Sequence, residues 1–327
     1  MLKNKVVLVT GGAGFIGSNL CESLLESKNI VRCLDNLSTG KKENIEHLLN
    51  NQNFTFIEGD IRDIETCRKA VDNVELVFHQ AALGSVPRSI NDPITTNDVN
   101  INGFLNMLVT SRDAEVKRFI FAASSSTYGD STSLPKVEDI IGKPLSPYAI
   151  TKYVNELYAE VFYKIYGLET IGLRYFNVYG RKQDPNGAYA AVIPKFTQLL
   201  MNLEPPIING DGTNSRDFTY IDNVIQMNFL AAETTKKEAL GTIFNTAVGD
   251  RTNLLQLTQL IKNYLSDFNP EISKVEIVHG PERKGDIPHS HASIDKAIKI
   301  LGYNPTYNLE LGLKEAVSWY WTQYKSK

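Results

Sequence analysis

The stretch that decides the fold is residues 6–17, Val-Val-Leu-Val-Thr-Gly-Gly-Ala-Gly-Phe-Ile-Gly. The apolar run at residues 6–9 predicts a buried strand, and the apolar spacing from Phe15 onward predicts a helix. Gly11, Gly14 and Gly17 fit a tight turn between the two, because glycine permits sharp turns and close backbone approach. Strand, turn and helix in this order are the opening unit of a parallel α/β sheet.

The rest of the first half repeats this alternation. Strands are predicted at residues 5–10, 30–35, 54–59, 76–79, 119–122 and 170–173, and helices at 15–26, 65–71, 97–111 and 147–166. Strands that alternate with helices pair in parallel through right-handed crossovers. We therefore expect a doubly wound (Rossmann) sheet with helices on both faces, formed by residues 1–176.

The second half has shorter elements, separated by turn signals such as Asp-Pro-Asn-Gly at 184–187. Helical patterns recur at residues 192–201, 223–233, 254–265 and 309–324. Residues 177–327 therefore predict mainly a smaller α/β substrate lobe. Within them, residues 217–247 are expected to cross back to the main sheet.

Composition excludes several classes of protein. The 327 residues carry a formal net charge of −3, with 42% hydrophobic and 22% charged residues, as in ordinary globular proteins. No basic stripe indicates nucleic acid as a partner, and no apolar run reaches the length of a membrane span or a signal-peptide core. Cys21, Cys33 and Cys67 lack metal-binding spacing, so we expect reduced, buried thiols, no metal and a cytoplasmic protein.

The glycine-rich turn favours a dinucleotide cofactor. A helix that begins on such a turn points its N-terminus at a pyrophosphate. Asp35 ends the second strand 18 residues after Gly17, where a carboxylate accepts hydrogen bonds from ribose hydroxyls and repels a 2′-phosphate. We therefore expect NAD and not NADP. Asp60 and Ile61 could hold the adenine. The alternatives are a turn that serves packing alone, with Asp35 capping a loop and Asp60 a solvated turn acid.

Residues 146–152, Ser-Pro-Tyr-Ala-Ile-Thr-Lys, predict a catalytic base. Ser146 suits a helix N-cap and Pro147 the first turn, so Tyr148 and Lys152 share one helical face. An ammonium about 5 Å from the phenol, at an effective dielectric constant of about 20, would lower its pKa by about 2 units. Ser124 follows a strand and could bridge a substrate oxygen to Tyr148. A surface tyrosine–lysine pair is the alternative.

With these motifs in order, the chain resembles extended short-chain dehydrogenases/reductases that modify nucleotide sugars, over almost its whole length. The motifs are residues 11–17, Asp35, 59–60, 79–82, 124–129, the Tyr148/Lys152 pair and 174–177. Segments 83–89, 183–189 and 249–252 resemble UDP-N-acetylglucosamine 4-epimerases of bacterial surface-polysaccharide pathways. Such enzymes usually dimerise through helices that correspond to residues 97–111 and 147–166, so a homodimer is expected.

The resemblance implies roles for individual residues. Ser124, Tyr148 and Lys152 would be catalytic. The cofactor would contact Gly11, Gly14, Phe15, Ile16, Gly17, Asp35, Asn36, Asp60, Ile61, Gln80, Ala81, Ala82, Asn100, Tyr148, Lys152 and, beside the nicotinamide, Phe176. The UDP-sugar would contact Gly84, Ser85, Ser124, Ser125, Ser126, Tyr148, Asn177, Val192, Lys195, Asn209, Arg216, Arg283, Asp286 and Ser290.

Departures from neighbouring subfamilies narrow the reaction. Sugar 4,6-dehydratases resemble this chain but have an Asp-Glu pair where Ser125 and Ser126 stand, and sugar-acid decarboxylases tend to have glutamate at Ser126. UDP-galactose 4-epimerases typically have lysine at Gly84, and many have tyrosine at Ser290. Small residues at both positions should leave room for an N-acetyl group.

These features together predict NAD-dependent C4 epimerisation of a UDP-N-acetylhexosamine (UDP-GlcNAc/UDP-GalNAc) through a 4-keto intermediate. One alternative is a UDP-hexuronic acid 4-epimerase, acting on UDP-GlcA or UDP-GlcNAcA, since Arg88 or Lys195 could meet the sugar carboxylate. The other alternative is a non-catalytic NAD-binding protein.

Overall fold

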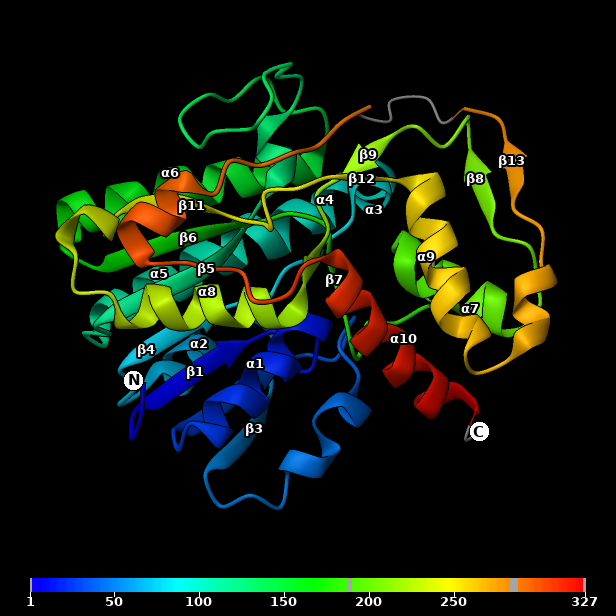
Figure 1. Ribbon diagram of the computed structural model, residues 1–327. Helices are drawn as coiled ribbons and strands as arrows, with labels where there is room; N and C mark the ends of the chain where they lie inside the picture. The colour runs from blue at the N-terminus through cyan, green and yellow to red at the C-terminus, as the bar shows by residue number, and fades with distance from the viewer. Residues whose placement is uncertain (1, 187–189, 283–287, 326–327) are drawn as a thin grey trace.

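The centre of the chain is a seven-stranded parallel sheet (Figure 1), in the order β11-β6-β5-β4-β1-β2-β3. The computed structural model describes residues 2–186, 190–282 and 288–325. The strands are β1 (Val6–Thr10), β2 (Ile30–Asp35), β3 (Phe54–Glu58), β4 (Leu76–His79), β5 (Arg118–Ser124), β6 (Glu169–Tyr175) and β11 (Thr242–Thr246). The chain order reverses between β1 and β4, which confirms the doubly wound α/β fold.

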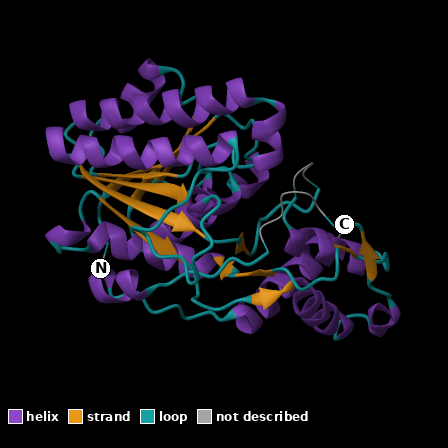
Figure 2. Cartoon of the chain, turned by 90° about the horizontal axis from the view of Figure 1, so that it is seen from above, coloured by secondary structure: helices purple, strands orange, loops and turns teal. Residues whose placement is uncertain are grey.

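Helices cover both faces of this sheet (Figure 2). On one face lie α1 (Phe15–Glu26) and α8 (Ile221–Glu233), and on the other lie α2 (Ile64–Val71), α5 (Phe104–Asp113) and α6 (Pro147–Tyr166). Neighbouring residues of β1 enter different cores, with Val7 and Val9 in one and Leu8 in the other. Successive side chains of a strand point to opposite faces, which explains why these strands are almost continuously apolar.

One predicted helix differs from its prediction. Residues 97–111 are the end of α4 (Pro93–Asn97), a π-helical turn at Asp98–Gly103 and α5. A short helix that the sequence did not indicate, α3 (Val86–Asn91), precedes them. Two residues of this wider turn are tightly packed. Asn100 is buried, and a Cβ at Gly103 would lie 2.6 Å from the Ile61 side chain. Single π turns inside helices occur frequently at functional sites.

A smaller group of elements lies beyond the carboxyl ends of the strands (Figures 1 and 2). Its helices are α7 (Val192–Met201), α9 (Leu254–Ser266) and α10 (Leu309–Lys325). Three two-stranded pairs accompany them: β7 (Val178–Tyr179) with β10 (Thr219–Tyr220), β8 (Ile207–Asn209) with β13 (Val278–Gly280), and β9 (Ser215–Arg216) with β12 (Thr252–Asn253).

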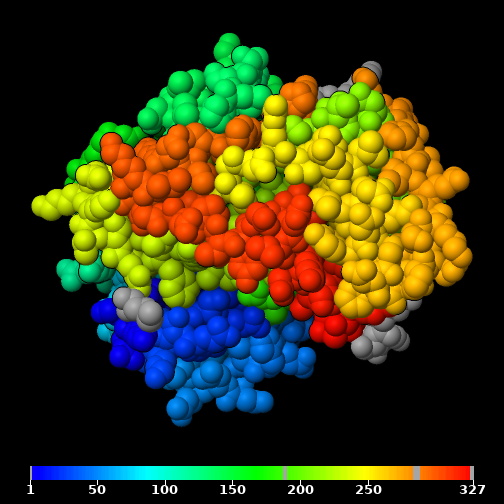
Figure 3. All heavy atoms as spheres, in the orientation of Figure 1, coloured from blue at the N-terminus to red at the C-terminus, as the bar shows by residue number. Residues whose placement is uncertain are grey.

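The second half of the chain also contributes to the main sheet. β11 pairs in parallel with β6, and the helical turn Ala297–Leu301 packs beside β11. This turn belongs to the orange segment on the surface seen in Figure 3. Arg118 of β5 binds Glu169 and donates to three carbonyls at the end of α8, those of Ala231, Ala232 and Thr234. These bonds fasten α8 to the sheet.

Within the described ranges, no helix combines the length and apolar character needed to cross a bilayer. The three cysteines are free and buried, as the sequence predicted.

Candidate active site

A cavity of about 340 Å³ opens at the carboxyl ends of β1, β2 and β4, where the strand order reverses. Ligands of open α/β sheets bind at this kind of position. Its lining brings together thirteen of the residues singled out in the sequence: Gly11, Gly14, Phe15, Ile16, Gly17, Asp35, Asn36, Asp60, Ile61, Gln80, Ala81, Ala82 and Gly84. Arg88 also lines it.

The passage from β1 into α1 accepts glycine alone at two positions, one in the loop and one in the first turn of α1. Gly11 has φ +68°, and a Cβ there would lie 2.7 Å from the backbone nitrogen of Ala81. A Cβ at Gly17 would lie 2.1 Å from the Gly11 carbonyl oxygen. The loop is thus folded tightly onto the first turn of α1, as the N-terminus of a pyrophosphate-binding helix requires.

Asp35 is fixed at the end of β2. Its two carboxylate oxygens accept hydrogen bonds from the backbone N–H groups of Ala13 (2.9 Å) and Leu37 (2.8 Å). Burial raises the pKa of Asp35, and these N–H donors act in the opposite direction. The side chain does cap the following loop, as the alternative reading held, but it also lines the cavity. Its remaining lone pairs are available to ribose hydroxyls.

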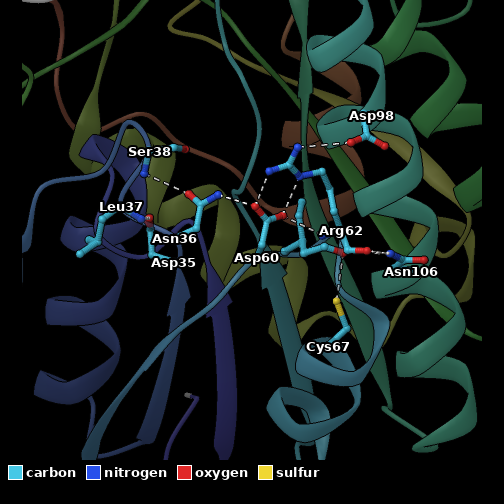
Figure 4. A network of polar contacts seen from close by, with 10 residues as sticks. Asp35, Asn36, Leu37, Ser38, Asp60, Arg62, Cys67, Asp98 and Asn106 are labelled. Atoms are coloured by element: carbon cyan, nitrogen blue, oxygen red, sulfur yellow. Dashed lines mark hydrogen bonds and ion pairs between the residues drawn. The ribbon is translucent and has the colours of Figure 1, made fainter.

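Figure 4 shows a polar network at the β3 end of the cavity. Asp60 accepts hydrogen bonds from Asn36 (2.7 Å), from the Arg62 backbone N–H (2.8 Å) and from the Arg62 guanidinium (2.8 and 3.0 Å). The guanidinium chiefly lowers the pKa of Asp60, to about 2. Arg62 also pairs with Asp98 at 3.3 Å. The sequence analysis missed Arg62, although a cation two residues after a turn acid was a readable signal.

The predicted catalytic residues come from two neighbouring elements. Ser146 caps α6 by accepting from the Ala149 N–H (3.1 Å), which places Tyr148 in the first turn, as predicted. Ser124 ends β5, and its hydroxyl oxygen accepts from the Ser126 hydroxyl (2.9 Å). The Tyr148 side chain lies beside Ser124, which lowers the pKa of Tyr148.

The structure does not show the net decrease in the pKa of Tyr148 that the spacing to Lys152 predicted. Burial is the largest influence and raises the pKa of Tyr148, while Ser124 lowers it. The Lys152 ammonium donates instead to the Ala122 carbonyl at 2.8 Å. Helical spacing predicts that the two side chains are close to each other. It does not predict how strongly burial disfavours the charged phenolate. Ionising this phenol requires additional positive charge near the hydroxyl.

Two amides beside the cavity are held by protein partners. The Asn100 side chain accepts from the Leu83 N–H (2.8 Å) and donates to the Leu83 carbonyl (3.2 Å) and the Thr151 hydroxyl (3.1 Å). It therefore ties the loop that carries Gly84 to α6. Gln80 accepts from the Tyr175 hydroxyl (3.1 Å) and donates to Asn228 (3.3 Å). The sequence analysis missed Tyr175 and Asn228.

The remaining predicted residues lie around this centre or farther out. Phe176 is fully buried against Tyr128, with ring centroids 5.9 Å apart. Ser85 caps α3, accepting from the Arg88 N–H at 3.1 Å, and Ser125 begins the short helical turn after β5.

In the smaller group of elements, the structure brings some predicted residues together and leaves others apart. The Arg216 guanidinium donates to the carbonyls of Ser215 and Pro288, and the Ser290 N–H also bonds to Ser215. The Asn177 amide donates to the Asp217 carbonyl at 2.9 Å. Val192 and Lys195 lie on α7, and Asn209 ends β8; of these, Lys195 and Asn209 are exposed. Arg283 and Asp286 lie outside the described residues.

His79, at the end of β4, lies in the core. Its ring packs against Phe104 and Phe119, with centroids 5.3 and 5.6 Å away, and Nδ1 lies 2.9 Å from the Thr10 hydroxyl. Burial, with a smaller effect from Lys152, lowers the pKa of His79 to about 3. Among the described residues, no three His, Cys, Asp or Glu side chains gather as ligands for a metal ion.

The low pKa of His79 predicts a pH-dependent stability. Between about pH 6.5 and 3 the unfolded chain binds a proton at this residue and the folded chain does not. The free energy of unfolding should therefore decrease as pH falls through this window, by up to about 1.4 kcal/mol per pH unit. Urea unfolding of the wild type and of His79→Gln at several pH values measures it. We expect the variant to lose this part of the slope; equal slopes would contradict the assignment.

Comparisons with known proteins agree with this geometry. The model of the NAD dependent epimerase/dehydratase family matches residues 7–247. This chain belongs to that family. A UDP-N-acetylglucosamine 4-epimerase from Methanobrevibacter ruminantium, solved with UDP-N-acetylmuramic acid, is 39% identical to this epimerase/dehydratase. The match covers 98% of this chain and 100% of that one, with a TM-score of 0.90.

Two other solved relatives of this chain contain different bound UDP-sugars. A UDP-glucose 4-epimerase from Thermotoga maritima, solved with UDP-glucose, is 39% identical, with 97% and 99% of the chains covered and a TM-score of 0.88. A UDP-glucuronic acid 4-epimerase from Bacillus cereus, solved with its UDP-sugar and NAD, is 31% identical, with 98% and 100% covered and a TM-score of 0.87.

The cofactor of this epimerase/dehydratase is NAD. The residues present fit NAD. The glycine loop leaves no room for side chains, so a pyrophosphate can approach the backbone, and Asp35 stands where a carboxylate is required to bind the ribose hydroxyls.

Proposed function

We propose that this protein is a UDP-sugar 4-epimerase whose substrate is a UDP-N-acetylhexosamine, UDP-GlcNAc or UDP-GalNAc. The observation that carries the proposal is the site at the end of β5. There Tyr148 lies beside Ser124, and serines stand at positions 125 and 126 with no acid pair to eliminate water. The chain has the serine and tyrosine that can move a proton at a sugar hydroxyl. It lacks the Asp-Glu pair with which a dehydratase eliminates water.

In the proposed reaction, the Tyr148 phenolate accepts the proton of the sugar C4 hydroxyl. After the 4-keto intermediate has presented its other face to the cofactor, Tyr148 returns the proton to the same oxygen. Bound NAD would supply the acceptor for the C4 hydride and the donor of a hydride to the opposite face, and its positive nicotinamide would favour the phenolate. Ser124 hydrogen-bonds the sugar oxygen and orients it toward Tyr148. Lys152 contributes its positive charge from the next helical turn. Because the 4-keto sugar must rotate within the site to present its other face, the binding energy has to come mainly from the UDP moiety.

The two halves of the chain divide these tasks in our proposal. Residues 1–176, with residues 217–247 returning to the sheet, hold NAD, and the rest of residues 177–327 mainly hold UDP. Arginines suit a pyrophosphate because the guanidinium donates two parallel hydrogen bonds, and Arg216 is the candidate among the described residues. Asn177, Val192, Lys195, Asn209 and Ser290, with Arg283 and Asp286, complete the proposed UDP-sugar site.

Space beside Gly84 supports an N-acetyl substituent. Gly84 lines the cavity, and a Cβ there would have no atom within 4 Å. A larger side chain would fill volume that the sugar's C2 substituent can use. Arg88 lines the same cavity and keeps one alternative open, the UDP-hexuronic acids, whose carboxylate requires a cation.

Proton NMR of the protein with UDP-GlcNAc, UDP-GalNAc, UDP-glucose, UDP-GlcA and UDP-GlcNAcA tests this proposal. We expect interconversion of the N-acetylhexosamines to have the highest kcat/KM. Gly84→Leu should lower the ratio of kcat/KM for the N-acetylhexosamine to kcat/KM for UDP-glucose by about tenfold or more, since the isobutyl group would clash with the acetamide. Gly84→Ala, the matched control, should change the ratio only slightly. Conversion of the uronates alone would replace the substrate class, and conversion of no UDP-sugar would refute the function.

We also propose that the protein is a homodimer. On α6, Ile150, Leu157, Val161 and Ile165 are exposed at helical spacing, and Ile94 of the adjoining α4 is 82% exposed. An apolar stripe of this kind favours a second copy of the chain as its cover. Phe162 of the same helix lies in the core and is not part of this stripe. A sedimentation mass of one chain would contradict the proposal.

A further inference from the structure

A buried carboxylate lies one helical turn beyond Lys152. Glu156 follows Lys152 on α6 at the spacing by which Lys152 follows Tyr148, so the three side chains share one face. Glu156 is 5% exposed and Lys152 is 2% exposed. A carboxylate in such a position stays charged only when it is well paired.

Arg174 of β6 supplies that pairing. Its guanidinium donates from Nε to one Glu156 oxygen (2.9 Å) and from Nη2 to the other (2.7 Å). The remaining Nη1 donates to the Glu138 carbonyl (2.9 Å), and the group lies 4.7 Å from the centre of the Tyr128 ring. Glu156 is therefore held in one place by a two-point ion pair with Arg174.

The other groups around Lys152 cannot replace this negative charge. β5 offers the neutral Ala122 carbonyl. His79 of β4 is uncharged at neutral pH, and burial raises the pKa of Tyr148, which disfavours its charged form. Arg174 of β6 is a cation, and the Glu138 carboxylate bonds the Asn245 N–H on β11. Among these described residues, Glu156 is the carboxylate that is buried with Lys152 on the same face of α6, and it opposes the effect of burial on the pKa of Lys152.

We propose that Glu156, oriented by Arg174, is a positioning residue that keeps Lys152 protonated during turnover. The inference rests on the proposed function, in which the Lys152 charge favours the Tyr148 phenolate. Burial lowers the pKa of Lys152 to about 8, and Glu156 opposes this decrease. Without Glu156, the ammonium would lose its proton nearer to neutral pH, and with it the charge that the phenolate requires.

The pH dependence of kcat for Glu156→Gln tests the proposal. Gln keeps the shape and one acceptor but removes the charge. We expect the basic limb of the profile to move to lower pH by about one unit or more, so that the loss of kcat grows with pH and reaches about tenfold. KM should change little, because Glu156 does not line the cofactor cavity. Glu160→Gln, which removes an exposed carboxylate one turn farther on, is the matched control and should leave the limb unmoved.

Bound NAD and the melting temperature show whether Glu156→Gln folds. If the unpaired Arg174 prevents folding, the double variant Glu156→Gln/Arg174→Met removes both buried charges, and its basic limb should still move to lower pH. A basic limb that stays at the wild-type pH in a folded variant overturns the inference and leaves the epimerase proposal intact. Absence of UDP-sugar conversion by the wild type instead refutes the proposed function.

Discussion

Replacing Tyr148 with phenylalanine is expected to lower kcat by about 10²- to 10⁴-fold while NAD remains bound. The hydroxyl is the only group that the change removes, and it is the atom that exchanges a proton with the sugar in the proposed mechanism. The ring still occupies the first turn of α6 behind the Ser146 cap. KM for the UDP-sugar should change much less than kcat, because the lost interaction belongs to the transition state.

Tyr153→Phe is the matched control for this experiment. Tyr153 lies on the same helix but lines a separate cavity with Glu138, Glu156 and Lys296. Its hydroxyl has no part in the proposed reaction, so kcat should stay near the wild-type value. Turnover is followed by NMR and bound NAD by absorbance of the denatured protein. A Tyr148→Phe enzyme that turns over as fast as the Tyr153→Phe control would remove Tyr148 from its proposed role.

Gly17→Ala should abolish tight NAD binding. The added methyl would lie 2.1 Å from the Gly11 carbonyl oxygen and 2.7 Å from the Gly12 Cα, both parts of the backbone. The glycine loop must therefore move away from α1. Strain of about 3 kcal/mol corresponds to a roughly 100-fold weaker complex. Cofactor content after purification and NAD titration measure the effect, and epimerase activity should fall with it.

Gly84→Ala serves as the control for the cofactor loop, because it adds the same methyl group elsewhere in the cavity lining, where no atom lies within 4 Å. Its NAD content should equal that of the wild type. Gly17→Ala protein that retains a full complement of NAD would show that the loop accommodates a side chain, against the observed contacts.

The sequence was a good guide to where the site residues lie along the chain, and a poorer guide to their partners. The turn at Gly11–Gly17 and the first turn of α6 form from residues close in sequence, so their spacing could be read directly. Arg62 was also within reach, since it follows Asp60 by two residues. The partners of Gln80 could not be read, because Tyr175 and Asn228 belong to β6 and α8 and meet Gln80 only in the folded sheet.

By itself, the sequence determined the parallel sheet, the glycine loop at its switch point and the Tyr148–Lys152 pair, because each follows from local periodicity and short-range sterics. Only the tertiary structure decided the electrostatics. Burial raises the pKa of Tyr148 where spacing alone predicted a decrease, and β6 brings Arg174 to Glu156 across eighteen residues of chain. Desolvation and long-range pairing depend on everything that packs around a group, so no local pattern encodes them.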